Sequence, residues 1–322
     1  MQESGQIAVG VVGLGYFGSH HARHYAGHAG ARLVAVVDAD PDRAGGAASK
    51  YGADAHRDHR DLVGKVEAVS ITVPTSHHYR VACDMIEAGI HVFIEKPIAT
   101  EVAEAADLVA RAGRRGTIVQ VGHIERFSPA FRALAAEVRA PRLIECVRRT
   151  PWSGRAADVD VVLDLMIHDI DLALSLAGAP VASVSASGVS VMTDGNDVAE
   201  ARLTFANGVV ATLATSRVAA AGERSLAVTE EGRRLSADLG NPSLSIVTRG
   251  AGAVSVETVA IDRADTLFAE IDAFLGSVRT GSRPLVDGAA GLDALGTAAM
   301  ILEAISAARR SASPSLNGVR EA

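Results

Sequence analysis

Short apolar runs alternate with amphipathic stretches in the first third of the chain. The runs cover residues 7–12, 33–37, 68–73, 92–94 and 117–121, and the stretches cover 17–26, 42–50, 77–88 and 102–112. Continuous apolar runs are typical of strands buried on both faces, and helices between them connect such strands in parallel. This pattern predicts an α/β fold with a doubly wound parallel sheet, because right-handed crossovers place helices on both faces.

After residue 122 the pattern changes to closely spaced strands. We expect strands at 143–147, 181–191, 198–205, 209–216, 225–228, 244–247 and 253–259. One helix should begin at residue 128, and three more should cover 161–176, 266–280 and 289–309. Asn207-Gly208 is typical of a hairpin turn and indicates antiparallel pairing around it. We therefore predict a first domain at 1–122, a second α/β domain on a mostly antiparallel sheet at 123–310, and a tail at 311–322.

Composition narrows the class of protein. The 322 residues agree with two domains, and 48% apolar with 21% charged residues excludes disordered and fibrous chains. A net charge of −7 argues against nucleic acid as a partner. Cys83 and Cys146 are too few for a disulfide framework. We find no signal peptide and no uninterrupted apolar run of about 18 residues, so we expect a cytoplasmic protein without a membrane partner.

A glycine-rich loop, Gly13-Leu-Gly15-Tyr-Phe-Gly18, directly follows the first predicted strand. Its spacing suits a tight turn, a close backbone approach to a pyrophosphate, and close packing of helix against strand. Asp38 ends the second predicted strand about 20 residues further on, where a carboxylate accepts hydrogen bonds from ribose hydroxyls. A turn that merely needs glycine is the alternative, but this context favours a dinucleotide. Asp38 repels a 2′-phosphate and is followed by Ala39, so we expect NAD rather than NADP.

Two charged residues end the predicted strand at 92–94. Glu95 and Lys96 come directly before Pro97, which cannot continue a central strand. Both charges therefore lie at the carboxyl end of a parallel strand, where such sheets bind ligands. A surface ion pair is the alternative.

A second candidate pair lies on the predicted helix at 161–176. Asp164 and His168 are four residues apart among apolar neighbours, which places both on one helix face. A carboxylate in that position orients an imidazole and raises its basicity. The alternative is a buried structural histidine, and Asp169 and Asp171 leave open which carboxylate faces the site.

These features occur together and in this order in a known family. Over about residues 6–310 the chain resembles the glucose-fructose oxidoreductase, inositol dehydrogenase and rhizopine-catabolism family. The motifs are GLGYFG at 13–18, Asp38, PTSHH at 74–78, Glu95-Lys96-Pro97 and Asp164-xxx-His168. The resemblance implies an NAD-binding Rossmann domain, a second domain on an open, mostly antiparallel sheet, and homodimers or homotetramers formed through that sheet.

Matching positions give the residues implied roles. Lys96 would hydrogen-bond the reacting hydroxyl, and His168, oriented by Asp164, would be its general base or acid. The residues implied to bind the cofactor are Gly13, Gly15, Tyr16, Phe17, Gly18, Asp38, Pro74, His78, Glu95 and Lys96. The family often has a Gly-Gly pair shortly before the Asp, where this chain has Val-Asp-Val-Val at 159–162. This difference concerns the implied contacts with the substrate more than the implied catalytic pair Asp164 and His168.

The substrate is indicated by two segments and by charge. Residues 122–129 and 161–171 are similar to the nucleotide-sugar branch of the family, which includes UDP-N-acetylglucosamine 3-dehydrogenases. Residues 126–155 hold seven arginines against two glutamates, and arginine suits a diphosphate. The candidate substrate-binding residues are Arg126, Phe127, Arg149, Trp152 and Arg155. A solvated basic surface is the alternative.

We therefore expect an NAD-dependent oxidoreductase that oxidises a secondary hydroxyl, with the 3-OH of a UDP-sugar such as UDP-N-acetylglucosamine as first candidate. The second hypothesis is a dehydrogenase of free inositol or glucose. Such a substrate has no diphosphate for the arginines of residues 126–155 to bind. A non-catalytic NAD sensor is the third, and it has no need of Lys96 and His168. No metal site is expected, because His20 and His24 have ligand-like spacing but no further ligand.

Overall fold

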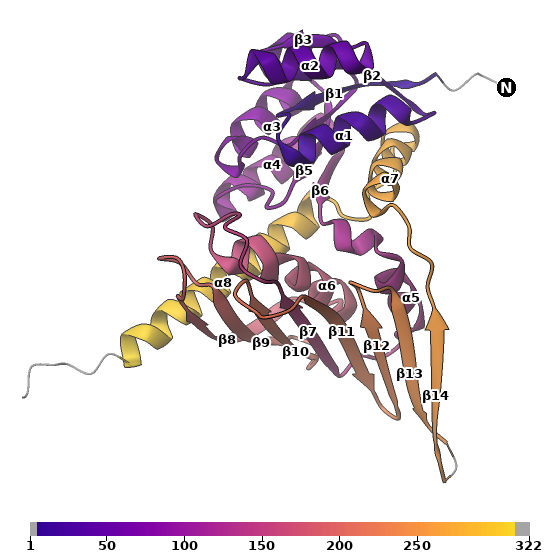
Figure 1. Cartoon of the computed structure of the whole chain (residues 1–322), viewed down its shortest axis with the longest axis vertical. Coiled ribbons are helices and arrows are strands. Elements are labelled where there is room, and N and C mark those ends of the chain that lie inside the picture. Colours follow the sequence, from indigo (N-terminus) through magenta and orange to yellow (C-terminus); the bar gives the residue numbers. More distant parts are fainter. Residues whose placement is uncertain (1–4, 251, 313–322) are drawn as a thin grey trace, which may run out of the picture. The chain divides into compact units, whose positions relative to one another are not determined.

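The computed structural model describes residues 5–250 and 252–312, which form two compact units (Figure 1). The first unit comprises residues 5–128 and 264–295, and the second comprises residues 129–263 and the chain from residue 296. Each unit contains one sheet, as the sequence predicted.

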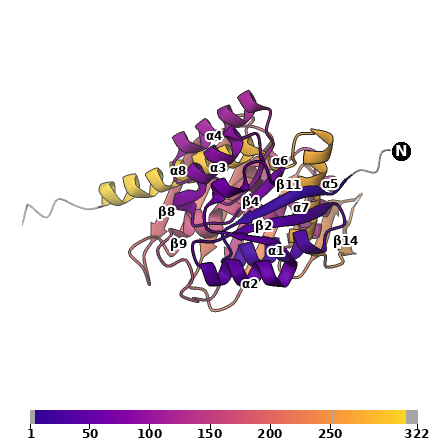
Figure 2. The same ribbon diagram turned by 90° about the horizontal axis from the view of Figure 1, so that it is seen from above.

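The first unit is built on a parallel sheet with the strand order β3-β2-β1-β4-β5-β6. Its strands are β1 (Ile7–Val12), β2 (Ala31–Val37), β3 (Asp54–His56), β4 (Ala68–Ile71), β5 (His91–Glu95) and β6 (Val119–Gly122). Its helices are α1 (Tyr16–Gly27), α2 (Pro41–Tyr51), α3 (His78–Glu87), α4 (Val102–Arg115) and α7 (Thr266–Thr280), with 3-10 turns η1 (His59–Leu62), η2 (Thr75–His77) and η3 (Ile124–Phe127). Figure 2 shows α3 and α4 on one side of this sheet and α1 and α2 on the other. This is the doubly wound arrangement predicted from the apolar runs.

Local sequence explains where helices of this unit begin and end. Asp40 accepts hydrogen bonds from the backbone N–H groups of Asp42 and Arg43 at the start of α2. Glu101 and Glu104 form a capping box at the start of α4. Both helices end at a glycine in the left-handed conformation, which satisfies a carbonyl of the last turn.

The second unit contains an eight-stranded sheet with the order β14-β13-β12-β11-β7-β10-β9-β8. Its strands are β7 (Leu143–Arg149), β8 (Val181–Val189), β9 (Val198–Phe205), β10 (Val210–Ser216), β11 (Glu223–Glu230), β12 (Arg233–Asp238), β13 (Ser243–Arg249) and β14 (Val254–Ala260). Only β7 and β10 pair in parallel, so the sheet is mostly antiparallel as predicted. The predicted turn at Asn207-Gly208 connects β9 and β10, and Gly208 takes the positive φ of +84° that such a turn requires.

Helices cover one face of this sheet. They are α5 (Pro129–Glu137), the π-helical turn η4 (Val162–Met166) and α6 (Ile167–Ala177), and α8 (Gly288–Ala312) runs from the first unit into the second. Along β9, alternate residues from Ala199 to Phe205 are buried, whereas Glu200 and Arg202 on the other face are exposed. The sheet therefore has one buried face and one solvated face.

The division of the chain differs from the one expected at residue 123. Residues 264–295 group with the first unit, because Ile271 and Phe274 of α7 pack in the same core as Tyr25 and Phe93. An amphipathic helix does not reveal in its own sequence which of two cores it will join. Residues 313–322 of the predicted tail lie outside the described residues.

One described helix, α8, has the length and hydropathy of a membrane span over Gly288–Ser311. Of its most apolar window 44% is buried in the protein, and Ala294, Ala298 and Ile301 are fully covered. Core helices of soluble proteins share these properties, so the helix is weak support for a membrane location.

Candidate active site

The loop after β1 and the first turn of α1 each contain a glycine whose surroundings leave no room for a side chain. Gly13 has a φ of +91°, and a Cβ there would lie 2.8 Å from the backbone of Thr72 and Val73. A Cβ on Gly18 would lie 1.8 Å from the carbonyl oxygen of Gly13. Gly15, the N-cap of α1, faces open space, and the helix has no side-chain cap. A helix start of this kind binds phosphate through its N–H groups and its dipole.

The Asp38 carboxylate lies beside this loop at the end of β2. Its Oδ2 accepts a hydrogen bond of 2.7 Å from the N–H of Leu14, and its Oδ1 accepts one of 2.9 Å from the N–H of Asp40. Each carboxylate oxygen can accept a further bond, so the fixed carboxylate suits a pair of ribose hydroxyls.

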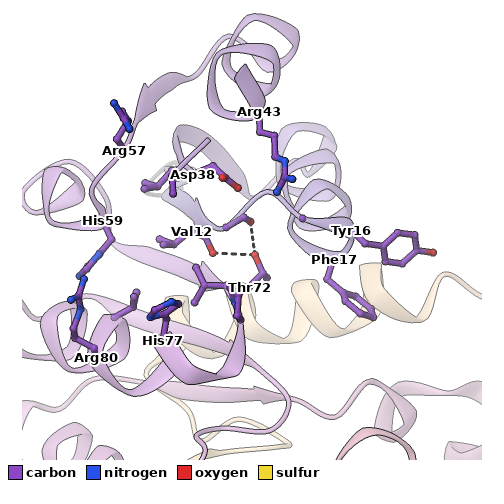
Figure 3. Close-up of a pocket in the computed structure, with 17 residues that line it drawn as sticks. Val12, Tyr16, Phe17, Asp38, Arg43, Arg57, His59, Thr72, His77 and Arg80 are labelled. Carbon is purple, nitrogen blue, oxygen red and sulfur yellow. Dashed lines mark hydrogen bonds between the residues drawn. The ribbon is translucent and has the colours of Figure 1, made fainter. Parts of the chain in front are cut away.

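A cleft of about 620 Å³ opens beside the loop and Asp38 (Figure 3). The predicted cofactor residues that line it are Gly13, Gly15, Tyr16, Phe17, Asp38 and Pro74. The lining also includes residues that were not among the predicted cofactor residues: Arg43, Arg57, His59, His77 and Arg80. The size of the cleft is typical of small-molecule sites, and the open helix start and carboxylate within it fit a dinucleotide.

His78, which the sequence placed at the cofactor, does not line this cleft. It is buried, with Nδ1 2.9 Å from the carbonyl oxygen of Pro97 and Nε2 2.9 Å from that of Val73. Burial lowers the pKa of His78, and the two carbonyl contacts oppose that shift. The neighbouring His77 lines the cleft instead, so His78 supports the segment that follows β5.

The end of β5 presents the predicted Glu95 and Lys96. Glu95 Oε1 lies 3.1 Å from His21 Nε2, and Glu95 Oε2 accepts a hydrogen bond of 3.2 Å from the backbone N–H of Lys96. A half-buried Lys96 follows, and the Lys96–Pro97 peptide bond is cis. Gly122 on β6 packs against Glu95, since a Cβ there would lie 2.8 Å from Oε2.

A buried histidine follows β6 near this end of the sheet. Burial, then the positive charges of Lys96 and Arg126, lowers the pKa of His123 to about 3. The imidazole of His123 is therefore neutral throughout the neutral pH range, and it adds no positive charge next to Lys96.

This depressed pKa predicts acid sensitivity. An unfolded histidine titrates near 6.5, so between that pH and about 3 the unfolded chain binds more protons and stability falls as pH falls. Between pH 7 and pH 5 the free energy of unfolding should drop by about 2 kcal/mol more in the wild type than in His123→Gln. Urea denaturation of both proteins at the two pH values measures the difference. Equal losses in the two proteins would contradict the assigned burial.

Asp164 and His168 lie on consecutive helical segments of the second unit. Asp164 is within the π-helical turn η4, and His168 is in the first turn of α6. Both are half-buried. Asp169 is 2% exposed and makes a bidentate ion pair with Arg148 of β7, with a shortest distance of 2.8 Å. Asp171 is also buried, so Asp164 is the most exposed of the three carboxylates that the sequence left open. Single π-helical turns occur frequently at functional sites.

The predicted substrate-binding residues fall in both units. Arg126 and Phe127 belong to η3 of the first unit, where Arg126 is half-buried and Phe127 is buried. In the second unit, Arg149 pairs with Glu223 at 2.8 Å on the surface. Trp152 and Arg155 are exposed in the segment that follows β7. The buried ion pair of Arg148 removes that arginine from the basic stretch available to a substrate.

Comparison with known proteins agrees with this geometry. Residues 7–123 match an oxidoreductase family described by its NAD-binding Rossmann fold, and residues 130–235 match the GFO/IDH/MocA C-terminal domain. The chain belongs to the GFO/IDH/MocA oxidoreductase family. It is an NAD-dependent dehydrogenase, as expected from the glycine loop and Asp38.

Relatives within the GFO/IDH/MocA family differ in how much of the chain they match. UDP-N-acetylglucosamine 3-dehydrogenase from Acidithiobacillus ferrooxidans is 40% identical over 308 residues, which are 94% of this chain and 98% of that protein. The same enzyme's solved structure superposes with a TM-score of 0.90 at 38% identity, with the same coverage. Inositol 2-dehydrogenase 1 from Saccharopolyspora erythraea is 40% identical, but over only 44% of this chain and 46% of that one. Levoglucosan dehydrogenase in complex with NADH and levoglucosan has a TM-score of 0.86 over 94% and 98% of the two chains, but at 19% identity it supports the fold alone.

Proposed function

We propose that this GFO/IDH/MocA protein oxidises a secondary hydroxyl of a UDP-sugar, with the 3-OH of UDP-N-acetylglucosamine as its first candidate. The similarity to UDP-N-acetylglucosamine 3-dehydrogenase over almost the full length of both chains carries the proposal. The glycine loop and Asp38 would hold the NAD, which would supply the acceptor for the hydride that leaves the sugar carbon.

We assign the proton chemistry to three side chains. The neutral imidazole of His168 takes the proton of the reacting hydroxyl, and the Asp164 carboxylate orients the ring. The Lys96 ammonium stabilises the negative charge that develops on the same oxygen as the C–H bond breaks. In the reverse direction His168 returns the proton. We thus propose for Lys96, His168 and Asp164 the same roles that the family resemblance implies.

For the substrate we assign the diphosphate to arginine and the rings to aromatic side chains. Arg149 makes only an exposed ion pair with Glu223, and such pairs contribute little to stability, so phosphate can replace the glutamate. Arg126 and Arg155 supply further charge, and guanidinium groups bind phosphate bidentately. Trp152, which is 37% exposed, offers a ring for stacking on uracil, and we keep Phe127 as a contact of the sugar.

Turnover of defined substrates tests the proposed function. With NAD, the purified protein should oxidise UDP-N-acetylglucosamine, measured by NADH fluorescence. Free N-acetylglucosamine and myo-inositol should show a kcat/KM at least about 10²-fold lower, because the charge-assisted contacts to the diphosphate are lost.

A control variant shows whether an arginine of the basic stretch binds the substrate specifically or whether the loss of any positive charge has the same effect. Arg155→Ala should raise the KM for the UDP-sugar but not for NAD, whereas Arg249→Ala, an exposed arginine at the end of β13, should change neither. Faster oxidation of myo-inositol than of any UDP-sugar would favour the polyol reading, which the shorter matches to inositol dehydrogenases support. NADH binding with no turnover of any sugar would identify a sensor.

We also propose that the protein is cytoplasmic and forms a homodimer or homotetramer through the second unit. The solvated face of the sheet, with Glu200 and Arg202 on β9, is the surface that we assign to this contact. The absence of a disulfide between Cys83 and Cys146 is compatible with a reducing compartment.

A further inference from the structure

Three fully buried polar side chains form a hydrogen-bonded network with the half-buried Glu95 at the end of β5. His21 of α1 is fully buried, and its Nδ1 lies 2.9 Å from Ser70 Oγ while its Nε2 lies 3.1 Å from Glu95 Oε1. Ser70 of β4 is also fully buried, and its Oγ lies 2.8 Å from the hydroxyl of Tyr25. The chain Tyr25–Ser70–His21–Glu95 thus connects three elements of the first unit.

The hydrogen bonds of this chain have one consistent direction with a neutral His21. A carboxylate only accepts, so Nε2–H donates to Glu95, and Nδ1 then accepts from the Ser70 hydroxyl. Ser70 in turn accepts from the Tyr25 hydroxyl, which stays protonated because burial raises the pKa of Tyr25 far above its usual value. Every proton in the chain has one acceptor, and a fully satisfied buried network is rigid.

Glu95, the last member of this hydrogen-bonded network, fixes the backbone of Lys96. One oxygen of Glu95 is bound to His21, and the other accepts from the N–H of Lys96. Gly122 closes the remaining side of the carboxylate. On the other side of Lys96, the carbonyl oxygen of Pro97 contacts the buried His78. Buried histidines therefore support both residues that flank Lys96 in the sequence.

We propose that His21 is a positioning residue for Lys96, acting through the Glu95 carboxylate. The proposal rests on the proposed function, since Lys96 needs a fixed place at the reacting hydroxyl only in an enzyme. Packing alone does not explain His21. Its ring makes an edge-on contact with Phe93 at 4.9 Å, and an apolar side chain would fill that space without the cost of burying polar groups.

Paired variants of His21 test this assignment. His21→Phe keeps a ring of similar size and removes both hydrogen bonds, whereas His21→Gln keeps a donor for Glu95 and an acceptor for Ser70. We expect kcat for the best UDP-sugar to fall about 10²-fold in His21→Phe, as for a misplaced catalytic group, and the glutamine to restore most of it. The Kd for NADH, measured by fluorescence titration, should stay within about 3-fold, because the cleft does not include His21.

His28, the C-cap residue of α1, supplies the matched control. It is also nearly buried, and its Nε2 lies 3.2 Å from a carboxylate oxygen of Asp272. His28→Gln should leave kcat within about 2-fold. If His21→Phe does not fold, Ser70→Ala replaces it, and we expect a kcat about 10-fold lower. An unchanged kcat in the folded His21 or Ser70 variant would overturn the proposal, as would an equal loss in His28→Gln.

A second readout separates this proposal from the proposed function. If the wild type oxidises no UDP-sugar, the proposed function fails, and acetylation of Lys96 by acetic anhydride, followed by peptide mass spectrometry, decides the role of His21. Without the contact from His21, Glu95 fixes the backbone N–H of Lys96 less firmly, and the lysine becomes more accessible to the reagent. The acetylation rate should therefore rise about 3-fold or more in His21→Phe. Equal rates in the wild type and His21→Phe would overturn the positioning role.

Discussion

Replacing Lys96 by methionine should lower kcat about 10³-fold, because the variant keeps most of the side-chain length but loses the charge that stabilises the developing alkoxide. The Kd for NADH should change by less than about 3-fold, since the cleft that we assign to the cofactor does not include Lys96. Steady-state turnover and fluorescence titration measure the two quantities on the same preparation.

Lys50 provides the control for this experiment. It is an exposed lysine of α2 that lies over the ring of Tyr51, and Lys50→Met should retain kcat within about 2-fold. A Lys96→Met enzyme with wild-type kcat would show that this ammonium does not act on the substrate. Loss of NADH binding together with kcat would instead place Lys96 at the cofactor alone.

Replacing His168 by asparagine should lower kcat about 10²- to 10⁴-fold, the range typical of a lost general base. The wild-type kcat/KM should fall as pH falls, because the base must be neutral to accept the hydroxyl proton, and this limb should be absent from the variant. His168 is the only histidine after His123 in the sequence, so no neighbouring imidazole of the second unit can replace it.

The companion variant Asp164→Asn keeps the shape of the orienting side chain and removes its charge. We expect a smaller loss of kcat than in His168→Asn, with the pH limb still present. An identical pH profile in the wild type and His168→Asn would contradict the role of His168 as the base.

Much of this architecture could be predicted because it depends on local sequence. Apolar runs located the parallel strands, Asn207-Gly208 located a hairpin, and the glycine spacing located the loop at the start of α1. The sequence pattern does not predict β3 and β12, because β3 has only three residues and neither strand is a clear apolar run.

Features that depend on distant contacts could not be predicted. In the sequence His21 is only one of several histidines after the glycine loop, and its partners Ser70 and Glu95 come from two distant strands, β4 and β5. His77 and His78 are adjacent, and only the fold decides which of them faces the cleft. The arginines along the cleft come from separate elements, so no spacing in the sequence brings them together.

A crystal structure of the protein with NADH and UDP-N-acetylglucosamine shows whether Lys96 and His168 act on the same hydroxyl. We expect Lys96 Nζ and His168 Nε2 both to lie within about 3 Å of one sugar hydroxyl, the 3-OH. The carbon that bears this hydroxyl should lie about 3–3.5 Å from C4 of the nicotinamide. Lys96 and His168 contacting different hydroxyls, or either of them facing away from the sugar, would contradict this expectation.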